Sequence, residues 1–355
     1  MIDKSKQFAR VKLKGTEKLE LIGSFATMLG SGISILEMVK SLSEDTKGGQ
    51  RMILDEMRDD LTQGKRIYVT FAKFPKVFDH VSVNVIKASE EAGTLDVALR
   101  DLRTTLQKDM EFNDKIRSAL MYPAFIVVVF IAILGMILTF VIPKISIVFI
   151  QLNVPLPLPT RIMILLSDII VKQTFWFVSG LAVIAGLIYY FFTFKRKQLL
   201  EFFYRLPLVS TLVMQIDVTN FARNLSVLLM SGLPITQALD LVAEVVIRRR
   251  MEKLLTNTKN MVLAGRSLSE GFRSDKGAVP SIVIKLVEAG EETGTLDRSL
   301  QEISEYFDYK VTYTLKSLTA LLEPVMLVLV GGVVGGMMLA IIAPVYGLIS
   351  QIGGA

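Results

Sequence analysis

The stretch EEAGTLD at residues 90–96 returns as EETGTLD at residues 291–297, and six of the seven residues are identical. The match is part of a longer duplication. Upstream, Ser31-Gly32 pairs with Ser231-Gly232 at an offset of 200 positions. The pairs at an offset of 201 include Gly64 and Gly265, Phe71 and Phe272, Pro123 and Pro324, and Pro143 and Pro344. Similarity at one fixed, long period predicts two copies of a single structural unit.

Apolar residues follow each heptad at spacings of three and four, which is typical of one face of an α-helix. They are Leu95, Leu99, Leu102, Leu106 and Met110 in the first copy, and Leu296, Leu300, Ile303, Phe307 and Val311 in the second. Alternating patterns typical of strands are scarce. We therefore expect an all-α protein with two homologous helical bundles of about six helices each, at residues 1–117 and 195–318.

The composition excludes several classes of function. The chain of 355 residues is 51% hydrophobic with a mean hydropathy of +0.49, which is too apolar for an ordinary soluble protein. It has no cysteine and one histidine, His80, so we expect no metal centre built on thiolate or histidine ligands and no Ser–His–Asp triad. Residues 1–117 carry 20 Lys and Arg against 18 Asp and Glu, a balance that argues against nucleic-acid binding. No phosphate-binding loop or other cofactor motif is present.

Three apolar segments predict transmembrane helices, at residues 118–143, 173–194 and 319–349. The first has no charged residue over 26 positions, against about 20 that a helix needs to cross a bilayer. No charged side chain follows Glu323. The first and third segments each begin near one proline and end near another. We therefore expect an integral membrane protein with three spans.

Lys and Arg are distributed unevenly around these segments. They are Lys115 and Arg117 before the first, Lys195, Arg196 and Lys197 after the second, and Lys310 and Lys316 before the third. Because basic residues favour the cytoplasmic side, residues 1–117 and 195–318 are predicted to be cytoplasmic. The loop at 144–172 and the tail at 350–355 are then on the opposite side, with the N-terminus in the cytoplasm.

Small and rigid residues mark the first and third spans. Two interleaved GxxxG pairs in the third span join Gly331 with Gly335 and Gly332 with Gly336. Such spacing lets helix backbones approach closely in lipid, so we expect these glycines to pack transmembrane helices. Pro123 and Pro324 occupy matched positions near the membrane entry of the two spans, where prolines are expected in a first turn or at a kink.

The second half of the heptad has the chemistry of a turn between helices. Gly93 and Gly294 are expected to end one helix in the left-handed conformation. Asp96 and Asp297 then fall in the first turn of the next helix, where the helix dipole favours negative charge. GTLD is therefore a sufficient helix–turn–helix device.

The leading Glu pairs are not explained by a turn. Near a helix C-terminus the dipole disfavours each anion by about 0.3–1 kcal/mol. Three interpretations stay open: a solvated or salt-bridged surface, a contact with a partner, and a divalent cation site. A hydrolase built on these carboxylates is less supported, because no nucleophile or accessory motif accompanies them. The candidate contact residues are Glu90, Glu91, Asp96, Glu291, Glu292 and Asp297.

The ordered set of motifs resembles the type II secretion system protein F and type IV pilus assembly protein C family of inner-membrane platform proteins. These motifs are SG followed by Ile or Leu, then EExGTLD, then a span that opens at a proline, each present twice. The connector between the copies holds PLPLPT at residues 155–160. The resemblance covers Leu19 to Gly347, and the short N-terminus resembles the type IVb pilus branch.

The resemblance implies a non-enzymatic role in the bacterial inner membrane, with the C-terminus in the periplasm. It implies that the chain couples a hexameric assembly ATPase to the insertion of pilin or pseudopilin subunits into a filament. Further implied partners are inner-membrane assembly proteins, membrane lipid and other copies of the chain. The alternative is an oligomeric transporter or channel component, for which charged or broken helices at mid-membrane would be expected.

Overall fold

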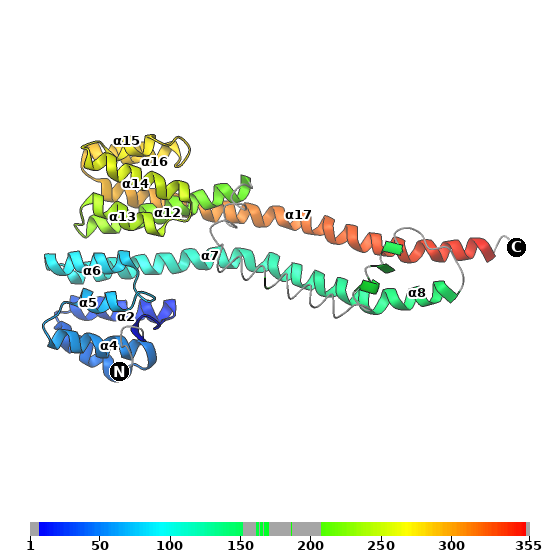
Figure 1. The fold of residues 1–355 in the computed structure, drawn as a ribbon, viewed down its shortest axis with the longest axis horizontal. Helices are drawn as coiled ribbons and strands as arrows, with labels where there is room; N and C mark the ends of the chain where they lie inside the picture. The colour runs from blue at the N-terminus through cyan, green and yellow to red at the C-terminus, as the bar shows by residue number, and fades with distance from the viewer. Residues whose placement is uncertain are drawn as a thin grey trace. The chain divides into compact units, whose positions relative to one another are not determined.

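The computed structural model describes two long stretches of the chain and a few residues between them. These are residues 7–151, 161, 162, 164, 165, 167–169, 186 and 207–352. They are almost entirely helical and include no β-strand, which confirms the predicted all-α class (Figure 1). The predicted second span at 173–194 lies outside the described residues except for residue 186, and the PLPLPT segment at 155–160 lies outside them entirely.

The chain divides into two compact units. The first comprises Met1–Lys115 and Ser210–Thr312, and the second comprises Ile116–Val209 and Tyr313–Ala355. The first unit therefore holds both copies of the duplicated helical domain, and the second holds the apolar segments.

Apart from a short helical turn at residues 7 and 8, six helices lie within the described residues of the first copy. They are α2 (Gly15–Gly30), α3 (Ile35–Asp45), α4 (Gly48–Thr62), α5 (Ile67–Lys73), α6 (His80–Ala92) and the start of α7 (Leu95–Met136). Local caps begin two of them, because Ser34 accepts from Glu37 N at 3.3 Å and Asp79 accepts from Ser82 N at 2.7 Å. The core is aromatic and aliphatic, and its buried side chains include Phe25, Met38, Ile53, Leu54, Met57, Phe71, Phe74 and Phe78.

The second copy repeats this arrangement. Its helices are α12 (Pro207–Met230), α13 (Ile235–Val245), α14 (Arg249–Leu263), α15 (Leu268–Arg273), α16 (Ser281–Thr293) and the start of α17 (Leu296–Ile352). Ser267 caps α15 by accepting from Glu270 N at 3.2 Å. Its buried core includes Phe221, Leu225, Leu239, Leu255, Phe272, Val283, Val287 and Leu300.

Helix α6 is buried on two faces, and this joins the copies. Ile86 packs in the core of the first copy. Val81 and Val85, which are only 5% and 1% exposed, pack in the core of the second copy together with Ala98 of α7. Helix α6 also contacts α13 directly. The two copies therefore share apolar packing within the first unit.

A buried ionic cluster distinguishes the first copy. The Asp60 carboxylate, 2% exposed, accepts from Lys73 at 2.6 Å, Lys65 at 3.0 Å and Thr70 at 2.9 Å. Burial alone would raise the pKa of Asp60, but the hydrogen bonds from Lys73, Lys65 and Thr70 lower it below its usual value. The second copy has Met261 at the matching position, so this cluster was not retained in both copies.

The long helices do not end at their second prolines. Helix α7 runs through Pro123 and continues as a π-helical turn, η1 (Ile137–Val141), and then as α8 (Ile142–Gln151), which contains Pro143. Helix α17 likewise continues through Pro344 to Ile352. A proline ring clashes with the carbonyl four residues earlier, which for Pro143 is Thr139 inside η1. At Pro143 the wider π-turn lets the helix continue. Where the predicted spans begin and end stays a prediction.

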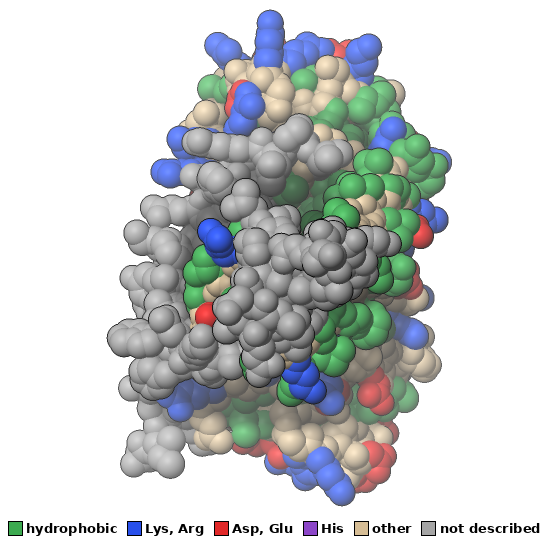
Figure 2. All heavy atoms as spheres, turned by 90° about the vertical axis from the view of Figure 1, so that its right-hand side faces the viewer, with side chains coloured by type: hydrophobic (Ala, Val, Ile, Leu, Met, Phe, Trp, Pro, Cys, Tyr) green, Lys and Arg blue, Asp and Glu red, His purple; other side chains and the backbone are tan. Residues whose placement is uncertain are grey.

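Among the described residues, two helices are long and apolar enough to cross a membrane, over Leu95–Lys144 and Leu296–Gly336. In the second unit their apolar side chains are largely exposed, and Figure 2 shows hydrophobic side chains gathered on the face toward the viewer. A Cβ added to any of the four predicted packing glycines would meet no atom within 4 Å. These are Gly331, Gly332, Gly335 and Gly336. Within the described part of the chain nothing lies within 4 Å of these positions, and their role in packing transmembrane helices stays a prediction.

Candidate functional site

Both heptads fold into the same helix–turn–helix. Gly93 ends α6 with φ of 74°, and Gly294 ends α16 with φ of 70°, a left-handed conformation that favours glycine. Thr94 N donates to Ser89 O at 2.9 Å, which satisfies a carbonyl left free at the helix end. The second copy repeats this bond with the same length. The GTLD part of the motif is thus accounted for by backbone geometry.

The first Glu of each pair caps a different helix. Glu90 lies near the C-terminus of α6, but its carboxylate accepts from Ile67 N at 2.9 Å and Tyr68 N at 3.2 Å, at the N-terminus of α5. Those amides have no partner inside their own helix, and the positive end of the α5 dipole favours an anion there. Arg66, the residue before α5, provides no side-chain cap. Glu90 therefore stabilises a short helix more than 20 residues upstream.

The second copy uses the same device. Glu291 accepts from Leu268 N and from Ser269 N, the latter at 2.9 Å, at the N-terminus of α15. Local sequence patterns do not predict this capping role, because the cap and the helix are far apart in sequence. The one sequence feature that points to it is that the Glu recurs in both copies near a helix C-terminus, where the dipole of its own helix disfavours an anion. Both Glu90 and Glu291 are half-buried in these contacts.

The second Glu of each pair is exposed. Glu91 lies 3.5 Å from Arg66 in a surface ion pair, and Glu292 is exposed to solvent. Asp96 pairs with Arg100 at 2.8 Å one turn along α7. Exposed pairs of this kind contribute little to stability. Of the four Glu residues in the two motifs, Glu91 and Glu292 are therefore the exposed ones.

The second turn also touches α12. Asp297 lies in the first turn of α17, and its backbone carbonyl accepts from the Ser226 hydroxyl at 2.8 Å.

Among the described residues, no three His, Cys, Asp or Glu side chains come together in a way that would hold a metal ion. The geometry therefore gives the cation interpretation of the Glu pairs no support.

Helices α16 and α17, which flank the second turn, pack closely against each other. A Cβ on Gly290 would lie 2.6 Å from the Ser299 hydroxyl oxygen and 2.8 Å from Ser299 Cβ. In the first copy the matching residues are Ser89 and Ala98. The serine is on α17 in the second copy and on α6 in the first, and each is paired with a smaller residue, so both copies keep two small residues at the crossing.

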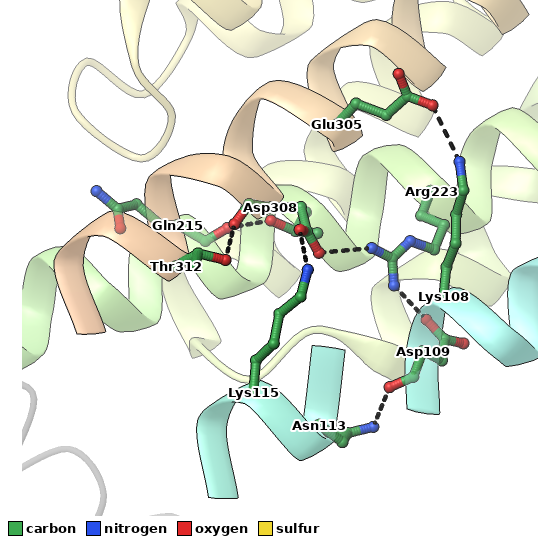
Figure 3. A network of polar contacts seen from close by, with 10 residues as sticks. Lys108, Asp109, Asn113, Lys115, Gln215, Arg223, Glu305, Asp308 and Thr312 are labelled. Atoms are coloured by element: carbon green, nitrogen blue, oxygen red, sulfur yellow. Dashed lines mark hydrogen bonds and ion pairs between the residues drawn. The ribbon is translucent and has the colours of Figure 1, made fainter. Parts of the chain in front are cut away.

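The two copies are also joined by buried charge, centred on Arg223 of α12. Arg223 is 7% exposed; its Nη1 donates to Asp109 of α7 at 2.5 Å, and its Nη2 lies 3.4 Å from Asp308 of α17 (Figure 3). The guanidinium also lies 5.4 Å from the centre of the Phe112 ring. Arg223 thus contacts the helix that leaves each copy toward the apolar segments.

Two lysines of α7 extend this network. Lys108 donates to Glu305 at 3.0 Å and Lys115 donates to Asp308 at 2.8 Å, so both reach α17 from the first copy (Figure 3). The hydrogen bonds from Lys108 and Gln301 lower the pKa of Glu305, which stays ionised. Three cations and three carboxylates therefore alternate along the contact between α7, α12 and α17.

Each copy has one arginine at this position in space, but on a different helix. The residue that matches Arg223 in the first copy is Gly23, and Arg103 of α7 fills the space there, with its Nε 3.2 Å from where a Cβ on Gly23 would lie. Ser304 of α17 matches Arg103. Each copy therefore keeps one guanidinium at this place, and only the second copy's arginine bridges the two domains.

A known protein family matches this chain twice, once in each copy of the duplicated unit. The family described as type II secretion system protein F matches residues 21–143 and again residues 221–344. The two matches start 200 positions apart and end 201 positions apart, as the duplicated motifs do.

Individual relatives match along nearly the whole chain. The chain is 30% identical over 330 residues to a type IV pilus assembly protein PilC of Thermus thermophilus, covering 92% of this chain and 81% of the relative. It is 27% identical to PilC of Myxococcus xanthus, covering 96% and 82%. It is 28% identical to type II secretion system protein F of Pseudomonas aeruginosa, covering 92% and 82%.

Proposed function

Because the chain belongs to the type II secretion system protein F family, we propose that it is an inner-membrane platform protein of a type IV pilus or type II secretion machine. In this role it couples a cytoplasmic assembly ATPase to the insertion of pilin or pseudopilin subunits into the filament. Relatives named for pilus assembly and for secretion match at comparable identity, so the proposal covers both systems.

The observation that supports coupling is the continuity of two helices. Helix α7 begins inside the first bundle and α17 inside the second, and both run without a break into apolar sequence. At 1.5 Å per residue, the 57 residues of α17 span about 85 Å. Each of these helices therefore links a bundle to an apolar segment through continuous backbone, which supports the proposal of coupling.

The charged network supports joint movement of the bundles. Arg223 contacts both long helices before they enter apolar sequence, and Lys108 and Lys115 link α7 to α17. The buried Arg223 carries most of this link, and the lysine pairs, which are largely exposed, add less. The two copies of the domain would then respond as one body to the ATPase.

The remaining parts of the proposal concern topology and partners. The protein is an adaptor without enzymatic activity, with both bundles in the cytoplasm, three spans, and the C-terminus in the periplasm. Glu91, Glu292, Asp96 and Asp297 are proposed contacts for the ATPase or another assembly protein, because they are charged and lie beside the two matched turns. The exposed apolar faces of α7 and α17 are proposed to meet lipid, pilin or another copy of the chain.

The proposal is tested with the full chain in its native membrane. Deleting the gene should abolish surface filaments or secretion while the pilin subunit stays at its normal level. The tagged full-length chain should co-purify the cognate ATPase after mild solubilisation. Filaments that still assemble without the protein would overturn the role, and normal assembly with no ATPase recovered from membranes or cross-linked cells would overturn the coupling.

A further inference from the structure

The segment that precedes α2 carries a row of exposed basic side chains. Arg10, Lys12 and Lys14 are exposed, whereas Val11 and Leu13 between them are half-buried and pack against the core of the first copy. Such alternation is typical of an extended backbone, in which successive side chains point to opposite faces. The three cations therefore lie on the outer face of one short segment.

The bundle holds this segment in place. The Phe8 ring is buried and lies 5.0 Å from the Phe74 ring of the core. Leu13 packs so closely on the start of α4 that a Cβ on Gly49 would lie 3.0 Å from its Cδ2 atom. The basic side chains are thus presented by a segment that is packed against the fold.

Lys47 adds a fourth cation from the other side of a hollow. It precedes α4 and lines, with Lys12 and Lys14, an open hollow of about 540 Å³. Among the described residues that line the hollow, Glu17 is the one acid, and its carboxylate accepts from the Lys14 backbone N–H at 2.8 Å. None of these cations forms an ion pair with another described residue. The four residues Arg10, Lys12, Lys14 and Lys47 are called the basic strip below.

The fold does not need these charges, because the second copy packs without them. At the offset of 200 positions, the residues that match the three cations before α2 are Ser210, Leu212 and Met214. Arg248 precedes α14 as Lys47 precedes α4, but its Nε lies 2.7 Å from the buried carboxylate of Asp217. The basic strip is therefore a feature of the first copy that the packing of a bundle does not explain.

The basic strip lies at the end of the first copy from which α7 enters apolar sequence. Gly15 follows the strip directly and begins α2, and a Cβ on Gly15 would lie 3.3 Å from Sδ of Met110 on α7. Met110 is eight residues before Ser118, where the first predicted span begins. Over eight residues the continuous helix α7 rises about 12 Å. The strip is therefore close to the level at which α7 would pass the headgroups of a bilayer.

We propose that the basic strip binds the anionic phospholipid headgroups of the membrane that α7 enters. Each lysine or arginine near such a surface strengthens binding about fivefold, through an attraction that salt screens. An acidic protein fits the strip less well, because three of its four cations are lysines and lysine is depleted in protein interfaces. Binding to the headgroups holds the first copy against the bilayer beside the point where α7 enters it.

The test uses the purified full-length chain in lipid vesicles. The inference rests on the membrane insertion contained in the proposed function, but it needs neither the ATPase nor the filament. The chain has no cysteine, so a fluorescent label can be attached to one introduced cysteine. Thr16→Cys places the label beside the strip, and Ser31→Cys places it about 22 Å away at the other end of α2. Both positions are exposed.

A quencher attached to the lipid headgroups reports contact with the surface. In vesicles with one third phosphatidylglycerol, the label on Thr16→Cys should be quenched more strongly than in phosphatidylcholine alone, and added salt should remove the difference. The label on Ser31→Cys should respond to neither change. Equal quenching of the Thr16→Cys label in the two kinds of vesicle overturns the proposal.

Matched variants separate the strip from the overall charge of the chain. Lys12→Gln with Lys14→Gln should lower the ratio of surface-bound to unbound label by on the order of 20-fold, because each lysine contributes about fivefold. Lys40→Gln with Lys76→Gln removes the same charge from exposed lysines outside the strip and should change this ratio little. Equal effects of the two double variants contradict the assignment to the strip.

Membrane insertion has a readout of its own. A label on Ile131→Cys, on the exposed apolar face of α7, should be quenched by a quencher in the acyl chains. Without that quenching, the proposed topology and this inference both fail. If Ile131→Cys is quenched but Thr16→Cys does not respond to anionic lipid, only this inference is overturned. Loss of filaments or secretion in the Lys12 and Lys14 double variant would then assign the strip to an acidic protein instead.

Discussion

Arg223 of the second copy donates to Asp109 of the first copy at 2.5 Å, although the two residues are 114 positions apart. The arginine is almost fully buried, whereas Asp109 is 39% exposed and Asp308, its other partner, is 22% exposed. The pair therefore lies at the margin of the contact between α7, α12 and α17. The buried guanidinium of Arg223 depends on these carboxylates for charge balance. Arg223 is therefore the residue on which the contact between the two copies most depends.

Arg223→Ala should destabilise the first unit by about 2–3 kcal/mol. Removing one member of a buried ion pair costs about 3–5 kcal/mol, and the partial exposure of both carboxylates reduces that figure. The measurement is the free energy of unfolding of the full-length chain in mild detergent. Arg249→Ala is the control, because Arg249 is exposed on the neighbouring α14, and it should change stability by less than about 0.5 kcal/mol.

A double-mutant cycle between Arg223→Ala and Asp109→Ala isolates the contact. We expect a coupling energy of about 1 kcal/mol or more, because the residues share a direct hydrogen bond. Additive single effects would show that Arg223 stabilises the protein by packing on Phe112 instead.

Glu291→Gln should destabilise the protein by about 1 kcal/mol, whereas Glu292→Gln should have almost no effect. Glu291 accepts two backbone hydrogen bonds at the N-terminus of α15, and the neutral amide loses both the charge and one acceptor. Glu292 is exposed and can change only binding. Thermal unfolding of both variants checks the first statement, and recovery of the co-purified ATPase checks the second.

The first copy provides an independent check on the same idea. Glu90→Gln and Glu91→Gln should show the same contrast in stability, because Glu90 caps α5 as Glu291 caps α15. If both variants of either pair lost the same amount of stability, the hydrogen bonds from the capping Glu would add no measurable stability of their own.

The turn and the helices were predictable because their signals are local. Gly93 needs a left-handed conformation that glycine adopts readily, and the spacing of Leu95, Leu99 and Leu102 determines one helix face within a few residues. The role of Glu90 was not predictable in this way, because it acts on amides that only tertiary packing brings near it. For the same reason Arg223 carried no signal, since its partners lie on helices far along the chain.

The second prolines, Pro143 and Pro344, lie inside helices, although a local rule would favour a helix end there. Pro143 removes one hydrogen bond, which favours a helix end in isolation. In the structure the loss is absorbed by the π-turn at Ile137–Val141, and the surrounding apolar sequence continues as helix. A helix in an apolar setting has few alternatives to its own backbone hydrogen bonds, so it continues where a helix in water would fray.

Gly290→Ala should destabilise the second copy by about 1–3 kcal/mol through overpacking. The added Cβ would lie 2.6 Å from the Ser299 hydroxyl, with the backbone of Leu296 also close, at 3.1 Å. Ser299→Ala removes the nearest atom and should recover part of the loss. Gly290→Ser with Ser299→Ala restores the pair found in the first copy, Ser89 with Ala98, and should be more stable than Gly290→Ser alone. A double variant no better than the single one would show that the backbone contact, which is common to both, sets the limit.

Asp60 should make stability depend on acid in a specific pH range. Hydrogen bonds from Lys73, Lys65 and Thr70 overcome the effect of burial and hold the pKa of Asp60 below the ordinary value of 3.8. The unfolded chain therefore takes up this proton at a higher pH than the folded chain, and stability falls as pH falls below that value. The contribution is fully present above pH 3.8 and is lost as pH passes through the lower pKa of the folded state. The check is to measure unfolding of the wild type and of Asp60→Asn from pH 6 to pH 2. Asp60→Asn should be less stable at pH 6, because Lys73 loses its anionic partner. Its stability should also fall less steeply than that of the wild type below about pH 4. Parallel curves for the two proteins would show that the cluster does not contribute to the acid dependence.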